Sequence, residues 1–149
     1  MTNYKQLWNK IIKDLDNDDI VIEVKVLNTR IQDWKNLLKF LHDRFSNIIF
    51  DDNISSEINA NSFPKSDNDT IKSLSLSFNY FNLTLSLYTI EEIEFFSDSV
   101  IKLNANNIEP LFSFCEMVSH TLSKNIYIYC EASDHRSLYY NHYNKLWEY

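Results

Sequence analysis

The chain has 149 residues, a formal net charge of −7 and no glycine. Average usage would be about 7% glycine. Its absence excludes the standard phosphate loop, dinucleotide fingerprint and nucleophile elbow, because each needs glycine for a positive φ or for close backbone approach. Alanine and proline are scarce and asparagine is abundant, with 18 residues, which is typical of an AT-rich gene.

Length and composition predict one domain spanning residues 1–149 with a conventional core, since 44% of the residues are hydrophobic. The N-terminal segment lacks the apolar stretch of a signal peptide, and no apolar run approaches membrane-spanning length. We therefore expect a cytoplasmic protein without a membrane span, in which Cys115 and Cys130 are reduced thiols.

The negative charge is concentrated in the middle third of the chain. Residues 45–101 contain nine acidic side chains and two basic ones, whereas the segments on either side are close to neutral. Such a field repels nucleic acid and anionic lipid and attracts cationic partners. Lysines and arginines elsewhere are mixed with acids on helix faces, so we expect neither nucleic acid nor membrane as a partner.

The first two predicted elements are a helix and a strand. Apolar residues at helical spacing predict a helix over residues 3–15, with a stripe that includes Leu7, Trp8, Ile11 and Ile12. A β-branched alternation then predicts a strand over residues 20–27.

A second helix follows. Thr29 and Gln32 match a capping box that would begin it, and Asn47 could supply the left-handed residue that ends it. Residues 47–50 are a short strand candidate. Residues 51–70 are polar and without periodicity, which predicts a long loop.

The clearest pattern is a β-hairpin over residues 71–78 and 81–88, in which apolar residues alternate with serine, threonine and asparagine. A two-residue loop sets three apolar pairs opposite one another: Phe78 with Phe81, Leu76 with Leu83, and Leu74 with Leu85.

A third strand over residues 93–96 can pair back onto this hairpin, which places Phe95 opposite Leu85. Glu92 and Glu94 then share the polar face with the serine and threonine side chains. That face is expected to be either hydrated or covered by a partner.

The C-terminal third is predicted to contain a helix and a strand. Asn106 or Asn107 would cap the helix, which has a proline in its first turn, and Asn125 would help to end it. Residues 126–131 alternate as a strand, and the tail from residue 133 could begin another helix. Together these patterns predict an α+β fold: an antiparallel sheet, with a central meander over about 71–97, and amphipathic helices packed on one face.

No catalytic or metal-binding pattern is convincing. Cys130, His135 and His142 fit no standard zinc spacing, and Cys115 and His120 lie on different sides of one predicted helix. Glu92 and Glu94 share a strand face, but nothing in the sequence would raise the pKa of either for acid–base catalysis. We therefore expect neither metal, cofactor nor enzymatic activity.

Two features favour protein recognition: the acidic middle third and an aromatic C-terminal tail. Acidic side chains would steer a cationic partner, and tyrosine or tryptophan would anchor it. The tail rings could instead cover the protein's own core. The candidate partner-binding residues are Asp51, Asp52, Glu91, Glu92, Glu94 and Asp98 for steering, with Tyr88, Tyr139, Tyr140 and Trp147 as anchors.

The stretches FNLTLSLYTIEEIEFFSDSV and NIEPLFSFCEMVSHTLSKNIYIYCEA read as meander strands, an acidic edge, a helix and a final strand. In this order of elements, and in size and acidity, the chain resembles bacterial immunity proteins of contact-dependent growth inhibition and polymorphic toxin systems. The resemblance implies a cytoplasmic antidote that binds one cognate toxin domain, often a nuclease, and blocks its active site or substrate groove. It implies no individual site residue, because these families share no motif.

Two alternatives remain open at this stage. The chain could be a small cytoplasmic enzyme with an unrecognised site, which requires a deep pocket with converging titratable groups. It could also be a structural or adaptor subunit that dimerises through the polar sheet face. As a binding module, it is expected to be a monomer or a weak homodimer.

Overall fold

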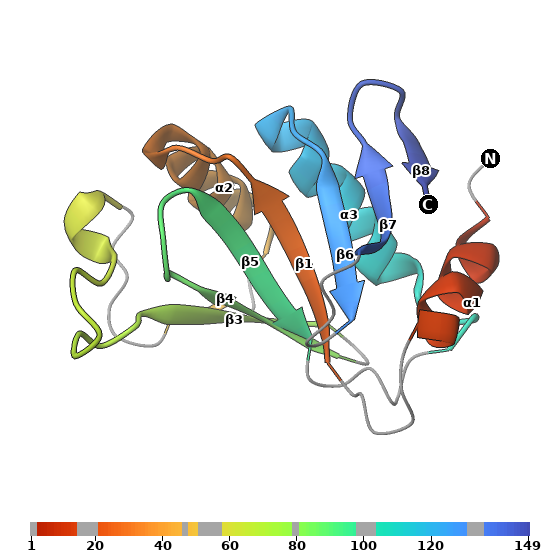
Figure 1. The fold of residues 1–149 in the computed structure, drawn as a ribbon, viewed down its shortest axis with the longest axis horizontal. Helices are drawn as coiled ribbons and strands as arrows, with labels where there is room; N and C mark the ends of the chain where they lie inside the picture. Colours follow the sequence, from red (N-terminus) through yellow and green to blue (C-terminus); the bar gives the residue numbers. More distant parts are fainter. Residues whose placement is uncertain are drawn as a thin grey trace.

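The computed structural model describes residues 3–14, 21–45, 48–50, 58–78, 81–97, 104–130 and 136–149. These residues form an α+β fold in which helices lie against one face of an antiparallel sheet (Figure 1). The elements are α1 (Tyr4–Asp14), β1 (Ile22–Leu27), α2 (Ile31–Arg44), β2 (Ile48–Phe50), the 3₁₀ turn η1 (Ala60–Ser62), β3 (Ser73–Ser77), β4 (Asn82–Ser86), β5 (Glu92–Ser97), α3 (Glu109–Leu122), β6 (Ile126–Cys130), β7 (Arg136–Asn141) and β8 (Leu146–Glu148).

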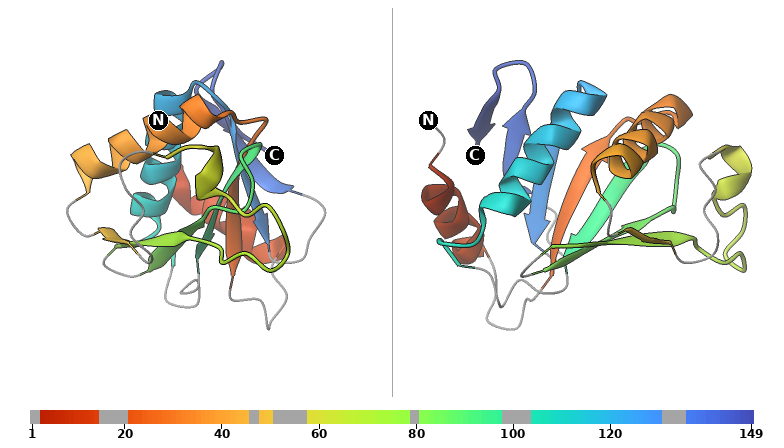
Figure 2. Two further views of the ribbon diagram at one scale, coloured as in Figure 1. Left: turned by 90° about the vertical axis from the view of Figure 1, so that its left-hand side faces the viewer. Right: turned by 180° about the vertical axis from the view of Figure 1, so that it is seen from behind.

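The sheet has the strand order β2-β3-β4-β5-β1-β6-β7-β8, and each neighbouring pair is antiparallel. The first strand of the chain therefore lies in the middle, between two meanders that come later in the sequence. Seen from behind, α2 and α3 lie in front of the strands, and α1 lies at the β7–β8 end of the sheet (Figure 2). The expected α+β class with helices on one sheet face is confirmed, and none of the described helices is long and apolar enough to cross a membrane.

The predicted register of the central hairpin is also confirmed. Leu74 lies opposite Leu85 and Leu76 opposite Leu83. Beyond the strand ends, the Phe78 amide donates to the Phe81 carbonyl at 2.9 Å and the two rings stack at 4.5 Å. Leu85 also faces Phe95 of β5, as expected. One-sided alternation of apolar and polar residues specifies this register, because a slip of one residue would turn the apolar set toward solvent.

The helix α2 begins one residue later than the capping box predicted. Arg30 is the N-cap, and its amide donates to the Asp33 carboxylate at 2.8 Å. The Thr29 hydroxyl instead donates to the carbonyl of Ile90 at 2.6 Å, and Trp34 Nε1 donates to the same carbonyl at 2.9 Å. Thr29 therefore joins α2 to the turn between β4 and β5 rather than capping the helix.

The predicted asparagine caps of α3 are wrong. Ile108 is the N-cap, and the asparagines before it close a turn of their own, in which the Asn104 amide donates to the Asn107 side chain at 2.7 Å. At the other end, Ser123 rather than Asn125 adopts the left-handed conformation, with φ 54°. The expected Asn47 stop lies outside the described residues.

The tail forms the β7–β8 hairpin and not a helix. The β7 strand pairs with β6, and the side chain of Asn141 closes the hairpin by accepting hydrogen bonds from the amides of Tyr143 and Asn144 at 3.0 and 3.1 Å. Cross-strand burial of Leu138 outweighs the weak helical signal of the sequence here.

Two further expectations need revision. Ile12, assigned to the apolar stripe of α1, is 47% exposed. Within the expected loop, Ile58 and Phe63 are buried, and the Phe63 ring meets Trp34 edge-on at 5.0 Å, so this segment is attached to the core at two points.

Candidate functional site

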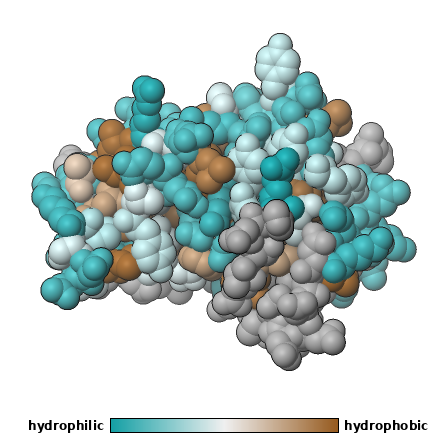
Figure 3. All heavy atoms as spheres, in the orientation of Figure 1, coloured by the Kyte–Doolittle hydropathy of each residue, from teal (hydrophilic) through white to brown (hydrophobic). Residues whose placement is uncertain are grey.

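The face of the sheet opposite the helices, here called the open face, combines charged and aromatic side chains on five neighbouring strands, β5, β1, β6, β7 and β8. Strand alternation and register place one set of residues on it, because their neighbours in β1, β5 and β6 are buried against the helices, and β7 and β8 continue the same register. These open-face residues are Glu23, Lys25, Glu92, Glu94, Phe96, Tyr127, Tyr129, Arg136, Tyr139 and Glu148. Figure 3 looks onto this side of the molecule, where hydrophilic and intermediate colours predominate over the described strands.

One lysine among three carboxylates lies at the centre of the open face. Lys25 Nζ is 3.4 Å from Glu92, 3.5 Å from Glu23 and 3.7 Å from Glu94. The arrangement follows from topology: β1 pairs with β5, so Lys25 lies directly opposite Glu94, and Glu23 lies two residues away on the same face. The single ammonium of Lys25 therefore lies near three carboxylates, so this cluster carries an excess of negative charge.

The pKa values of this cluster reflect that imbalance. Burial would lower the pKa of Lys25, but the charges of Glu94, Glu92 and Glu23 outweigh it and raise the pKa above its ordinary value. Burial also raises the pKa of Glu94, and repulsion from Glu23 and Glu92 adds to this effect, while Lys25 only partly opposes it. The sequence offered no reason for a raised carboxyl pKa, because the packing of β5 against β1 could not be read from it.

Aromatic rings continue the open face toward β7. Lys25 Nζ lies 5.0 Å from the centroid of the Tyr129 ring, and Tyr127 stacks on Tyr139 at 5.6 Å. The Arg136 guanidinium lies over Tyr139 at 4.7 Å from its centroid. Tyrosine and arginine are enriched where proteins bind one another, because their wide flat groups bury large areas and keep polar contacts.

The predicted partner-binding residues do not form one surface among the described residues. Glu92, Glu94 and Tyr139 lie on the open face. Tyr140 and Trp147 lie on the helix side, where the Trp147 ring meets Phe112 at 5.2 Å. These two rings therefore cover the protein's own core, which was the alternative interpretation of the tail.

The remaining predicted residues lie at one end of the sheet or outside the described part. Tyr88 is 45% exposed in the turn between β4 and β5. In the same turn, the Glu91 carboxylate accepts a hydrogen bond from the Thr89 hydroxyl, which lowers the pKa of Glu91. Asp51, Asp52 and Asp98 lie outside the described residues.

Catalytic and metal-binding chemistry finds little support in the described side chains. No group of three histidine, cysteine, aspartate or glutamate residues among them could hold a metal ion. Cys115 and Cys130 are free and buried, and burial raises the pKa of the Cys115 thiol far above its usual range. A buried thiol with so high a pKa is a poor nucleophile.

Sequence reasoning did not select Glu23, Lys25 or Arg136, nor the rings on β5 and β6. A usable signal was present for Tyr127 and Tyr129, because the alternation in IYIYCE already turned them away from the core. What was missing was the position of β1 between β5 and β6, which gathers these residues into one cluster. No protein-family model, curated protein or solved structure matches the chain.

Proposed function

We propose that this protein is a toxin-neutralising immunity protein, which binds a cationic, nuclease-type toxin domain through the open face and blocks its active site or substrate groove. The observation that carries the proposal is the Lys25 cluster, in which three carboxylates surround one ammonium on an aromatic sheet face opposite the described helices. Lysine or arginine side chains of a partner would supply the missing positive charge.

The charge and composition of the open face support this kind of partner. Four glutamates face one lysine and one arginine across the open face, so the face is acidic. Acidic surfaces steer cationic proteins during encounter, and aromatic rings slow dissociation once the rings are buried. A domain that binds nucleic acid carries such a cationic surface, because it must neutralise phosphates.

In this proposal the protein acts as a stoichiometric binder in the cytoplasm, without a cofactor and without catalysing a reaction. It is a monomer or a weak homodimer until it meets the toxin domain. The mixture of carboxylates and rings also disfavours nucleic acid and membrane surfaces as ligands, since both are anionic.

The first test is genetic. The protein is co-expressed with toxin domains encoded immediately upstream of its own gene, and growth is scored with and without it. Rescue by this protein, and no rescue by an unrelated acidic protein of similar size, would support the proposal. Failure to bind or neutralise any adjacent toxin domain would contradict it.

The second test measures how matched charge variants of this protein bind the toxin domain that it neutralises in the first test. Glu92→Gln together with Glu94→Gln should slow association and weaken its dependence on ionic strength in stopped-flow measurements. The control removes the same charge elsewhere, by Asp43→Asn with Asp67→Asn, two exposed residues outside the open face. Equal effects of the two pairs, or an unchanged salt dependence, would remove the open face from the interface.

A further inference from the structure

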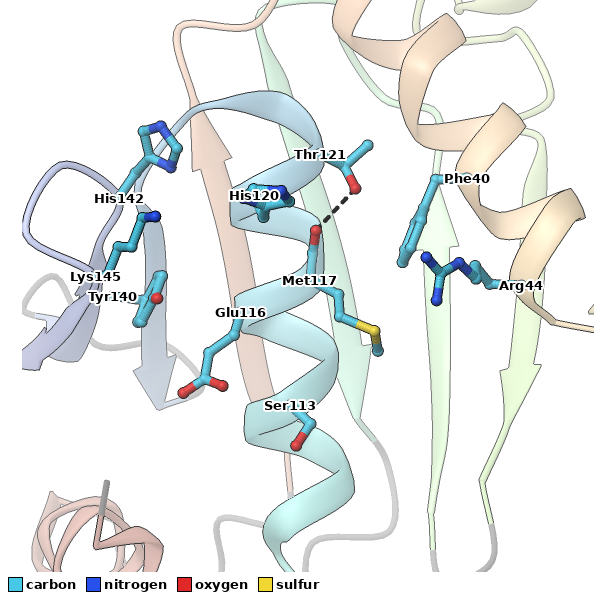
Figure 4. Close-up of a pocket in the computed structure, with 10 residues that line it drawn as sticks. All are labelled: Phe40, Arg44, Ser113, Glu116, Met117, His120, Thr121, Tyr140, His142 and Lys145. Atoms are coloured by element: carbon cyan, nitrogen blue, oxygen red, sulfur yellow. Dashed lines mark hydrogen bonds between the residues drawn. The ribbon is translucent and has the colours of Figure 1, made fainter. Parts of the chain in front are cut away.

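A trough lies on the helix side of the molecule, where α3 forms its floor. One wall is α2, which contributes Phe40 and Arg44, and the other is the β7–β8 hairpin, which contributes Tyr140, His142 and Lys145 (Figure 4). Its volume is about 390 Å³, within the range of small-molecule sites. The floor residues are Ser113, Glu116, Met117, His120 and Thr121.

Basic side chains border this trough on three elements, although the protein as a whole is acidic. Arg44 comes from the last turn of α2, His120 from α3, and His142 and Lys145 from the hairpin. Neither Arg44 nor Lys145 takes part in an ion pair with another described residue.

The single carboxylate of the trough is already occupied by other donors. Glu116 Oε1 accepts the indole N–H of Trp147 at 2.8 Å, and Oε2 accepts the hydroxyl of Tyr4 at 3.1 Å. In Figure 4 the Glu116 side chain lies on the hairpin side of α3, away from Arg44. Glu116 keeps its negative charge, but its two hydrogen bonds hold it on the hairpin side of α3, where it does not pair with Arg44.

Hydrogen bonds hold the backbone of the hairpin wall in place, and so they fix the positions of the Cα atoms of His142 and Lys145. The His142 amide donates to the Asn125 side chain at 2.8 Å, and the Lys145 amide donates to the Asn141 carbonyl at 2.8 Å. Lys145 has a left-handed backbone, with φ 55°. Such a conformation is uncommon for lysine and is expected to cost free energy.

Apolar groups lie between these charges. Met117 extends toward Phe40 and Arg44 in Figure 4, and the Tyr140 ring lies on the opposite side of α3. The Thr121 hydroxyl donates to the Met117 carbonyl at 2.9 Å, so its proton is used within the helix. The trough therefore has basic side chains on both walls, an apolar group beside each wall, and a mainly polar floor.

We propose that this trough binds a small organic anion, whose carboxylate or phosphate group contacts the basic side chains of one wall, either Arg44 or Lys145 with His142, while its apolar body lies along the α3 floor beside Met117. Charge-assisted hydrogen bonds and an apolar lining are the two contributions that such a ligand needs. The trough is on the helix side, so this proposal does not depend on the partner proposed for the open face.

The test titrates the protein with phenyl phosphate, phthalate and inorganic phosphate, and with benzyl alcohol as a neutral aromatic control. Binding is followed by the NMR signals of the Trp147 indole, which donates to Glu116, and of the His120 and His142 rings. We expect saturable shifts at these groups with at least one aromatic anion, weaker shifts with inorganic phosphate, and none with benzyl alcohol. Comparison of phenyl phosphate with phthalate shows whether phosphate or carboxylate is preferred.

Variants provide the second arm. Arg44→Gln or Lys145→Gln, whichever alters the wall that holds the anionic group, should weaken binding of the preferred anion about tenfold, whereas Lys5→Gln, an exposed lysine on α1 with the same change of charge, should leave it unchanged. The proposal is overturned if no aromatic anion produces saturable shifts in the unaltered protein. It is also overturned if Lys5→Gln weakens binding as much as the trough variants do.

Discussion

The indole N–H of Trp147 donates to Glu116 Oε1 at 2.8 Å, which joins the last strand of the sheet to the helix that lies over it. Tyr4 of α1 donates to the other carboxylate oxygen at 3.1 Å. One carboxylate on α3 thus connects elements from both ends of the described chain. A residue that the sequence suggested as a partner anchor is therefore part of the fold itself.

Trp147→Phe should lower the free energy of unfolding by about 1–2 kcal/mol, because it retains an aromatic ring and removes the donor to Glu116. The measurement is urea denaturation followed by circular dichroism. Glu116→Gln serves as the comparison, since it keeps one acceptor oxygen and should cost less. If Trp147→Phe is as stable as the unaltered protein, the hydrogen bond does not contribute to stability.

Lys25→Gln should lower the free energy of unfolding by about 1–2 kcal/mol at pH 7.5, between the values typical of exposed and of buried ion pairs. Without the ammonium, Glu23, Glu92 and Glu94 repel one another and take up protons more readily when folded. The difference in the free energy of unfolding between Lys25→Gln and the unaltered protein should therefore become smaller as the pH falls toward 4. Lys35→Gln, an exposed lysine on α2, is the control and should change stability by less than about 0.5 kcal/mol.

Glu94→Gln should stabilise the protein at pH 7.5. Burial raises the pKa of Glu94 above its ordinary value of 4.5, so the folded state binds this proton more tightly than the unfolded state does. The contribution of Glu94 to stability is then complete below pH 4.5 and is lost as the pH rises through the raised pKa. The gain from glutamine should be present at pH 7.5 and absent at pH 4, as measured by denaturation at both values.

The same prediction bears on the proposed interface. A carboxylate that costs stability at neutral pH is typical of a binding surface, where function rather than stability determines the residue. Lower stability of Glu94→Gln at pH 7.5 would contradict a raised pKa of Glu94 in the folded protein. It would mean that Lys25 stabilises the charge of Glu94 more than burial opposes it.

Ser97→Ala should raise the free energy of unfolding by about 0.5–1 kcal/mol. Ser97 is fully buried in β5, and its hydroxyl is the buried side-chain group without a hydrogen-bond partner among the described residues. Ser137→Ala is the matched control, because Ser137 is also buried but lies 3.3 Å from Cys130 Sγ, so its loss should destabilise. The stability of both variants is measured by thermal denaturation. A Ser97→Ala variant that is less stable than the unaltered protein would contradict the prediction.

The parts of the fold that depend on local alternation could be predicted from the sequence, and those that depend on distant pairing could not. The pairing of Leu76 with Leu83 follows from two adjacent alternating segments. By contrast, Lys25 meets Glu94 on one side and Tyr127 on the other only because β1 pairs with strands far along the chain. No local pattern encodes that choice of neighbours.

Turn and cap residues were the least predictable. Thr29 is a residue type that commonly caps helices, yet its hydroxyl donates a hydrogen bond to the carbonyl of Ile90 in a different part of the fold. Likewise, Ser123 and Lys145 adopt left-handed conformations that no sequence pattern predicted, as does Asn28, whereas the residue predicted to adopt one was Asn47. Tertiary contacts determine these backbone positions, and residue preference is only a weak guide to them.

The central position of β1 has a consequence for how the chain reaches its native state. The meander β3–β5 and the strands β6–β8 each pair between sequence neighbours, and can form early at little entropic cost. The strand β1 is synthesised before either of them; it has no strand neighbour until β5 exists, and it lacks its second neighbour until β6 follows. The joining of the two halves through β1 is then the late and slow event, as is usual where contacts are distant in sequence. Until then its apolar side chains Ile22, Val24 and Val26 are without their native cover, and the nascent protein is most exposed to aggregation.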